Sequence, residues 1–489
     1  MKKGFDNDLY IRQQSEHIRQ RIDQFGGKLY LEFGGKLFDD YHASRVLPGF
    51  EPDSKMRMLC ELRADAEIII AISAADIEKS RVRGDLGISY DEEVFRLIGI
   101  FRDHGLYVGS VVITRYAAQP VVDAFRRRLR EVGVPSFLHY SILGYPSDIA
   151  HIVSDEGYGR NEYVETKKPL VVVTAPGPGS GKMATCLSQL YHEYRRGVKA
   201  GYAKFETFPV WNLPLKHPVN IAYEAATVDL DDVNMIDPFH LEKYGVTTVN
   251  YNRDVEIFPV LHAMLEKIQG SSPYFSPTDM GVNMAGSCIV DEEAVNEAAR
   301  REILRRYYQT AVKEKRTGSD GTLTSKMELL LNRAEVSPEV RPVIAAAGAR
   351  AEETGKPAGA MELPDGTLVT GKTTDLLGAS AALLLNALKR LAGIDQEQDI
   401  IRPEALKPIC DLKTRHLHHK NPRLHSDEVL IALSISSARS AEAAKALEQL
   451  EKLRGCDAHF TVILSRADEK TYQALGLYAT CEPQVEIKH

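Results

Sequence analysis

Short apolar runs alternate with runs of helical periodicity along the N-terminal half of this chain. Strands are expected at 28–33, 67–73, 107–114, 136–140, 169–174 and 202–208, and helices at 91–103, 120–132 and about 181–196. Parallel strands need a crossover connection, which is usually a helix. The alternation therefore favours an α/β fold with a mainly parallel N-terminal sheet and helices on both of its faces.

The pattern changes after residue 208. Loop signals dominate 209–277, and two helical runs follow near 291–313 and 325–333. The polar stretch 313–322 is the best linker candidate because it is charged and contains glycine. A helical, loop-rich middle region is therefore expected between the two ends of the chain.

The last third reads as a separate α/β unit. Met361–Thr370 predicts a hairpin around Pro-Asp-Gly, and a buried helix is expected over 374–391. A strand at 429–434, a helix at 440–453 and a strand at 459–464 complete the pattern. We expect three regions: an α/β domain at 1–230, the middle region at 231–340, and a C-terminal α/β sandwich at 341–489.

Charge and cysteine content exclude several protein classes. The chain has 61 Lys and Arg against 68 Asp and Glu, a net charge of −7, so we expect no nucleic-acid partner. No apolar run approaches the ~20 residues that span a bilayer, so no membrane partner is expected. The six cysteines lack Cys-x-x-Cys spacing, which predicts reduced thiols in the cytoplasm.

The strongest local motif is the run Thr174-Ala-Pro-Gly-Pro-Gly-Ser-Gly-Lys-Met-Ala-Thr185, between an apolar strand and a helix. It resembles the phosphate-binding pattern G-x-x-x-x-G-K-[ST] at Gly181-Lys182. It departs from that pattern at Pro176, where the first glycine belongs, and at Met183, where the metal-binding hydroxyl belongs. A tight structural turn with a solvated Lys182 remains the alternative.

In the ligand-binding interpretation, backbone N–H groups and the helix end hold a phosphate, and Lys182 neutralises its charge. Thr185 could supply a hydroxyl to Mg²⁺. The residues expected to hold the ligand are Gly177, Gly179, Ser180, Gly181, Lys182 and Thr185.

Two further segments are candidates for the same site. Lys204 and Glu206 share one face of the following strand by period two, although an ion-paired edge strand is the alternative. Asp229 and Asp231 could bind Mg²⁺ together with substrate phosphates, although aspartates are equally common in turns.

A third candidate is the exit of the first strand, Gly34-Gly35-Lys36. Adjacent glycines permit close approach of the backbone to a ligand, and carboxyl ends of strands line ligand crevices in such sheets. A flexible connection is the alternative.

No zinc site is predicted. His416, His418 and His419 match no standard ligand spacing, and a solvated histidine group is the alternative whose role stays open. The zinc-protease signature His-Glu-x-x-His is absent from the sequence. The C-terminal hairpin and helix resemble the opening of the cytidine-deaminase-like fold, but its zinc-binding motifs are missing.

Three stretches resemble a conserved bacterial family that carries a domain-of-unknown-function label: 13–40, 175–182 and 223–240. The resemblance covers nearly the whole chain and implies a cytoplasmic bacterial protein of several domains. Some members are named "ATP-dependent zinc protease", a name that this sequence does not support. The resemblance supplies no catalytic residues.

The glycine-rich turn is also similar to the branch of P-loop kinases and ligases that includes dethiobiotin synthetase. There, the loop is followed by a strand that carries a lysine, and Lys182 and Lys204 would fill those places. Met183 departs from the branch at the metal-binding position.

The sequence thus predicts a protein that binds ATP, another nucleotide or a phosphorylated metabolite, with Mg²⁺, and transfers a phosphoryl or acyl-phosphate group. Lys182, Lys204 and Lys36 are the expected catalytic residues. Two alternatives stay open: an enzyme or binding protein for a non-nucleotide anionic metabolite, and an oligomeric scaffold without a catalytic role.

Overall fold

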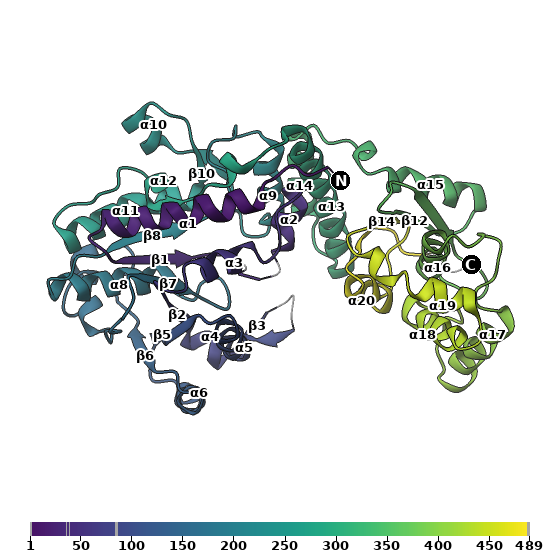
Figure 1. Ribbon diagram of the computed structural model, residues 1–489, viewed down its shortest axis with the longest axis horizontal. Helices are drawn as coiled ribbons and strands as arrows, with labels where there is room; N and C mark the ends of the chain where they lie inside the picture. Colours follow the sequence, from purple (N-terminus) through teal and green to yellow (C-terminus); the bar gives the residue numbers. More distant parts are fainter. Residues whose placement is uncertain (1, 36, 39, 84–86, 487–489) are drawn as a thin grey trace. The chain divides into compact units, whose positions relative to one another are not determined.

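A computed structural model of the chain describes residues 2–35, 37–38, 40–83 and 87–486 (Figure 1). The chain divides into two compact units, Met1–Ala299 and Arg300–His489. Helix α13 (Glu292–Thr317) contains the division between them. The three regions expected from the sequence, 1–230, 231–340 and 341–489, stay a prediction beside this two-unit division.

Within the described ranges, the first unit is built on a seven-stranded sheet of order β11-β8-β1-β7-β2-β5-β6. Its strands are β1 (Leu29–Phe33), β2 (Ala66–Ser73), β5 (Tyr107–Tyr116), β6 (Ser136–Tyr140), β7 (Leu170–Thr174), β8 (Gly201–Phe205) and β11 (Gly281–Val282). All neighbouring pairs run parallel. The expected α/β fold with a mainly parallel sheet is therefore confirmed.

Both faces of this sheet are covered. Tyr30 of β1 and Val171 of β7 share a core with Leu190 of helix α8 (Lys182–Arg195) and Leu261 of helix α11 (Asn252–Gln269). Leu31 points to the opposite face by alternation and is also fully buried. This two-sided burial explains why β2 and β7 read as continuous apolar runs.

The helices of the first unit are α1 (Asn7–Gln24), α2 (Tyr41–Val46), α3 (Ser54–Glu61), α4 (Ala74–Glu78), α5 (Tyr90–Asp103), α6 (Pro120–Glu131), α7 (Ile149–Ile152), α8 (Lys182–Arg195), α9 (Pro218–Ala226), α10 (Pro238–Tyr244), α11 (Asn252–Gln269) and α12 (Pro277–Met280). Two short antiparallel pairs join β3 (Val82–Arg83) to β4 (Ile88–Ser89) and β9 (Asn234–Ile236) to β10 (Val249–Tyr251). Helix α11 lies in a stretch that the sequence predicted as loops. It contains Pro259, although proline in a helix interior usually kinks or breaks the helix.

The second unit has a separate mixed sheet of order β13-β12-β14-β15. Its strands are β12 (Ala358–Glu362), β13 (Leu368–Lys372), β14 (Asp457–Phe460) and β15 (Tyr478–Cys481). Its helices are α14 (Thr322–Arg333), α15 (Pro342–Thr354), α16 (Ala379–Ala392), α17 (Pro403–Asp411), α18 (Ser426–Ser437), α19 (Ala441–Leu447) and α20 (Arg466–Ala474). The expected C-terminal α/β unit and its hairpin, β12–β13, are confirmed. The cytidine-deaminase resemblance is not confirmed.

One expected strand is wrong, because residues 429–434 lie in helix α18. The helix begins with a capping box in which Glu428 bonds back to the His425 backbone. Its apolar run is short, and periodicity alone does not separate a short buried helix from a strand. Along the described chain, none of the helices combines the length and apolarity needed to cross a membrane.

Candidate ligand-binding site

The turn between β7 and α8 lies at the carboxyl end of β7. Gly181 forms the N-cap of α8 with φ +86°, and no side chain caps this helix end. A Cβ at position 181 would lie 3.0 Å from Cγ2 of Thr114, so conformation and space both require glycine. The first N–H groups of α8 therefore lack both an intrahelical acceptor and a side-chain cap.

Side chains hold the carbonyl groups of this turn. Ser180 Oγ donates to Gly177 O at 2.9 Å, and Thr114 Oγ1 donates to Ser180 O at 2.7 Å. Arg115 Nη2 donates to Gly179 O at 2.6 Å. These bonds orient the carbonyl groups of Gly177, Gly179 and Ser180, whereas no hydrogen bond is made by the backbone N–H groups of Gly179, Ser180 and Gly181 to the described residues.

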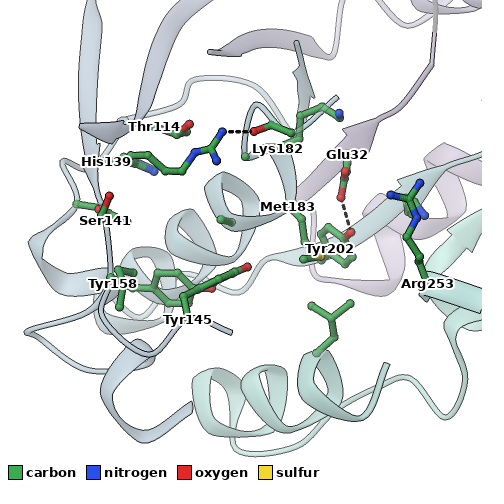
Figure 2. Close-up of a pocket in the computed structure, with 18 of the residues that line it drawn as sticks. Glu32, Thr114, His139, Ser141, Tyr145, Tyr158, Lys182, Met183, Tyr202 and Arg253 are labelled. Atoms are coloured by element: carbon green, nitrogen blue, oxygen red, sulfur yellow. Dashed lines mark hydrogen bonds between the residues drawn. The ribbon is translucent and has the colours of Figure 1, made fainter. Parts of the chain in front are cut away.

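A cavity of about 660 Å³ opens beside the turn (Figure 2). It is lined by the turn and the start of α8, by the carboxyl ends of β1, β5, β6 and β8, and by residues of α11 and α12. Small-molecule pockets usually measure ~300–1,000 Å³, and in parallel α/β sheets they lie at the carboxyl ends of strands. The cavity has the size and position of a small-molecule site.

Part of the lining is aromatic or apolar. Tyr145 and Tyr158 lie close together in the cavity wall, and Met183 and Tyr202 also line the cavity (Figure 2). Tyr158 and Tyr202 are themselves buried. Such a surface suits the non-ionic body of a small molecule.

Cationic side chains outnumber anionic ones among the described lining residues. The cations are Arg115, Lys182, Lys204 and Arg253, and the anions are Glu32 and Asp254. His139 adds no charge near neutral pH, because burial lowers its pKa to about 3. Lys182 makes no ion pair or side-chain hydrogen bond within the described part of the chain. Lys204 and Arg253 are ion-paired with carboxylates, whereas Arg115 and Lys182 make no ion pair among the described residues. These two cations favour an anionic ligand.

Lys204 differs from Lys182 because carboxylates surround its ammonium group. Lys204 Nζ pairs with Asp254, and with Glu206 Oε1 at 2.9 Å. Burial alone would lower the pKa of Lys204, but the two carboxylates outweigh it and hold that pKa above the usual range. Burial raises the pKa of the Glu206 carboxyl, although Lys204 opposes this shift. Lys204 is therefore a fixed positive charge in the cavity wall.

The structure brings four of the residues predicted from sequence to one cavity: Gly179, Gly181, Lys182 and Lys204. Gly177 and Ser180 belong to the same turn but do not line it. Thr185 is fully buried, and its hydroxyl donates to Gly181 O at 2.9 Å inside α8.

The other predicted residues lie elsewhere. Gly34 and Gly35 follow β1 outside the described lining, and a Cβ at Gly35 would lie 3.1 Å from Nζ of Lys55. Lys36 lies outside the described residues. Asp229 and Asp231 are exposed between α9 and β9. His416, His418 and His419 are also exposed, and within the described ranges no group of three or more His, Cys, Asp or Glu could hold a metal ion.

Sequence reasoning missed Glu32, Arg115, Arg253 and Asp254, which also line the cavity. Glu32 and Arg115 stand near the carboxyl ends of predicted strands, a position that could have marked them. Arg253 and Asp254 begin α11, in the stretch predicted as loops, so no sequence signal pointed to them.

Comparison with known proteins covers almost the whole chain. Residues 3–335 match the description "Domain of unknown function DUF1846, N-terminal", and residues 339–489 match its C-terminal counterpart. The chain belongs to the DUF1846 family. It is 58% identical to "UPF0371 protein stu1377" of Streptococcus thermophilus over 99% of this chain and 98% of the relative. A UPF0371 protein of Streptococcus pneumoniae strain JJA is 57% identical over the same shares.

These matches confirm the bacterial family resemblance. Because the DUF1846 relatives are covered over nearly their full length, the similarity includes the sequences of both units. The cavity lies wholly within the part that matches the N-terminal description of DUF1846.

Proposed function

We propose that the first unit binds a phosphorylated small molecule in the cavity, with its phosphate at the start of α8. Lys182 is the observation that carries this proposal. It has no ion pair among the described residues, it stands at the N-terminus of α8, which no side chain caps, and it lines the cavity. A helix N-terminus carries roughly half a positive charge, and lysine adds a full one. Both favour a phosphate over a neutral group.

Arg115 supports the same ligand chemistry. It lines the cavity and already holds the turn through Gly179 O. A guanidinium has several N–H donors in a fixed plane. The donors that Arg115 does not use on Gly179 are therefore suited to a phosphate bound at the turn.

The first turn of α8 favours a phosphorylated metabolite over a Mg²⁺–nucleotide. Met183 lines the cavity where a P-loop carries its metal-binding hydroxyl. The Thr185 hydroxyl is bonded to Gly181 O instead. Neither residue supports Mg²⁺ bound at this turn.

Phosphoryl or acyl-phosphate transfer is a second candidate, favoured by Lys204 in the same cavity. A fixed positive charge can stabilise the charge that develops on a transferring group. The readout for this candidate is movement of the phosphoryl group from any compound that binds to water or to an added hydroxyl or carboxylate acceptor, followed by ³¹P NMR.

The test is a thermal-shift screen with inorganic phosphate, sugar phosphates, ATP and GTP, each with and without Mg²⁺. A ligand at a hundred times its Kd adds about 2.7 kcal/mol of stability. Each kcal/mol of added stability raises the midpoint temperature of thermal unfolding by roughly 2–4 °C in a domain of about 150–250 residues. We expect a shift without Mg²⁺ that Lys182→Ala abolishes.

Lys199→Ala is the matched control, because Lys199 is exposed and remote from the lining. It should keep the full shift. A screen without any shift in the wild-type protein would contradict the proposal and favour the scaffold alternative. A shift that survives Lys182→Ala would place the ligand elsewhere.

A further inference from the structure

Glu32 stands where a second part of the ligand would lie. It is on β1, which pairs with β7 on one side and β8 on the other. Its register partners are Val173, next to the last residue of β7, and Lys204 of β8. Neighbouring strands lie about 4.8 Å apart. The Glu32 carboxylate therefore enters the cavity one strand away from the phosphate-binding turn.

A tyrosine holds this carboxylate in place. Tyr202 Oη donates to Glu32 Oε2 at 2.7 Å, and Tyr202 is almost fully buried (Figure 2). Glu32 makes no other side-chain hydrogen bond or ion pair within the described ranges. Its Oε1 has no hydrogen-bond partner among the described residues, and Glu32 lines the cavity, so this oxygen can accept a bond from a ligand.

The charges around Glu32 select the kind of donor that it accepts. Lys204, whose ammonium group stays charged, is its register partner on β8. A ligand ammonium at Glu32 would be repelled by the Lys204 ammonium, whereas a hydroxyl donates a hydrogen bond without adding charge. An ionised carboxylate is an acceptor only, so hydroxyl groups suit it.

We infer that the ligand is a phosphorylated polyhydroxy compound, with adjacent sugar hydroxyls bound by Glu32 and the phosphate bound at the start of α8. This inference rests on the proposed function and names its ligand class. A carboxylate beside a phosphate-binding turn recognises ribose hydroxyls in doubly wound sheets by the same chemistry. The cavity of about 660 Å³ is large enough for a sugar phosphate.

The experiment is calorimetric titration of the full chain with ribose 5-phosphate, 2-deoxyribose 5-phosphate and inorganic phosphate. We expect the ribose compound to bind about tenfold more tightly than the deoxy compound, the size of a hydrogen bond to a charged group. Glu32→Gln should remove most of this preference and leave the affinity for inorganic phosphate unchanged. Tyr202→Phe should reduce the preference, because Tyr202 positions the carboxylate.

Glu131→Gln is the control, because Glu131 is an exposed residue of α6. It should keep the wild-type preference. Equal binding of the ribose and deoxy compounds by the wild-type protein would overturn the inference and leave the phosphate proposal standing. Failure of all three compounds to bind would overturn both. A preference that survives Glu32→Gln would assign the hydroxyls to other residues and refute the role of Glu32.

Discussion

Two glycines of the β7–α8 turn share a left-handed conformation but differ in their surroundings. Gly179 has φ +77° and Gly181 has φ +86°. A Cβ at 179 would meet nothing within 4 Å, whereas a Cβ at 181 would crowd Thr114 at 3.0 Å. A substitution at Gly179 therefore tests only the unfavourable left-handed backbone, whereas a substitution at Gly181 also tests the steric clash of a Cβ with Thr114.

We expect Gly179→Ala to lower the free energy of unfolding by about 1 kcal/mol, because the left-handed conformation costs an L-residue about 1–2 kcal/mol. Gly181→Ala should cost at least about 1 kcal/mol more, because Thr114 must also move. Urea unfolding of both variants measures the difference. Equal losses would mean that the Thr114 contact does not restrict this position.

These residues also show how far a site can be predicted from sequence. Gly179, Gly181 and Lys182 could be predicted because the chemistry lies in one continuous run between a strand and a helix. Glu32 had only its place near the end of a predicted strand to mark it, and Asp254 had no signal because it lies in the first turn of α11, in a stretch predicted as loops. A lone carboxylate in sequence does not reveal which strands will flank it.

At the scale of elements, one carboxylate links three helices of the second unit. Asp468, in the first turn of α20, accepts hydrogen bonds from Ser380 of α16 at 2.8 Å and from the backbone N–H of Ser426 of α18 at 2.8 Å. It also pairs with His425 Nδ1 at 2.9 Å. Burial would raise the pKa of Asp468, but bonds from His425 and Ser465 lower it overall.

The same bond makes the stability of this unit depend on pH. The hydrogen bond to Asp468 raises the pKa of His425 above its ordinary 6.5. The stabilisation that the protonated His425 adds to the folded unit is therefore complete below about pH 6.5 and is lost as the pH rises through the raised pKa. The stabilisation that ionised Asp468 adds to the folded unit is complete above its ordinary pKa of 3.8 and is lost as the pH falls through its lowered pKa. The pair therefore stabilises most between about pH 4 and about pH 6.5.

We expect His425→Gln to destabilise the chain most within that window and progressively less above it. Urea unfolding between pH 4 and 9 measures the difference from wild type. Asp468→Asn should cost roughly 2–3 kcal/mol near neutral pH, because it weakens a buried, charge-assisted network. A His425→Gln effect that is constant with pH would contradict the ion pair.

Element type was predictable where a run was long or flanked by clear breakers, as for the β12–β13 hairpin and all strands of the parallel sheet except the two-residue β11. It failed at α18, whose apolar run is compatible with either a helix or a strand until its capping and packing are known. It failed also at α11, a helix in a stretch predicted as loops, which contains Pro259 in its interior. In both cases the information that decides the element comes from its tertiary surroundings.

At the scale of the whole molecule, each unit buries a core of its own. Tyr30, Val171 and Leu261 belong to one core of the first unit, and Leu384 and Phe460 belong to the core of the second. Separate cores commonly unfold in separate transitions. Scanning calorimetry of the full chain should therefore show two transitions.

Their assignment follows from variants placed in one unit each. Asp468→Asn should lower only the transition of the second unit, since every contact described for Asp468 lies there. A bound phosphorylated compound should raise only the transition of the first unit, because binding stabilises only the part that forms the site. With ribose 5-phosphate as the probe, Lys182→Ala should abolish that rise and leave the other transition unchanged. A single transition, or a ligand that raises both transitions equally, would show that the two units unfold cooperatively.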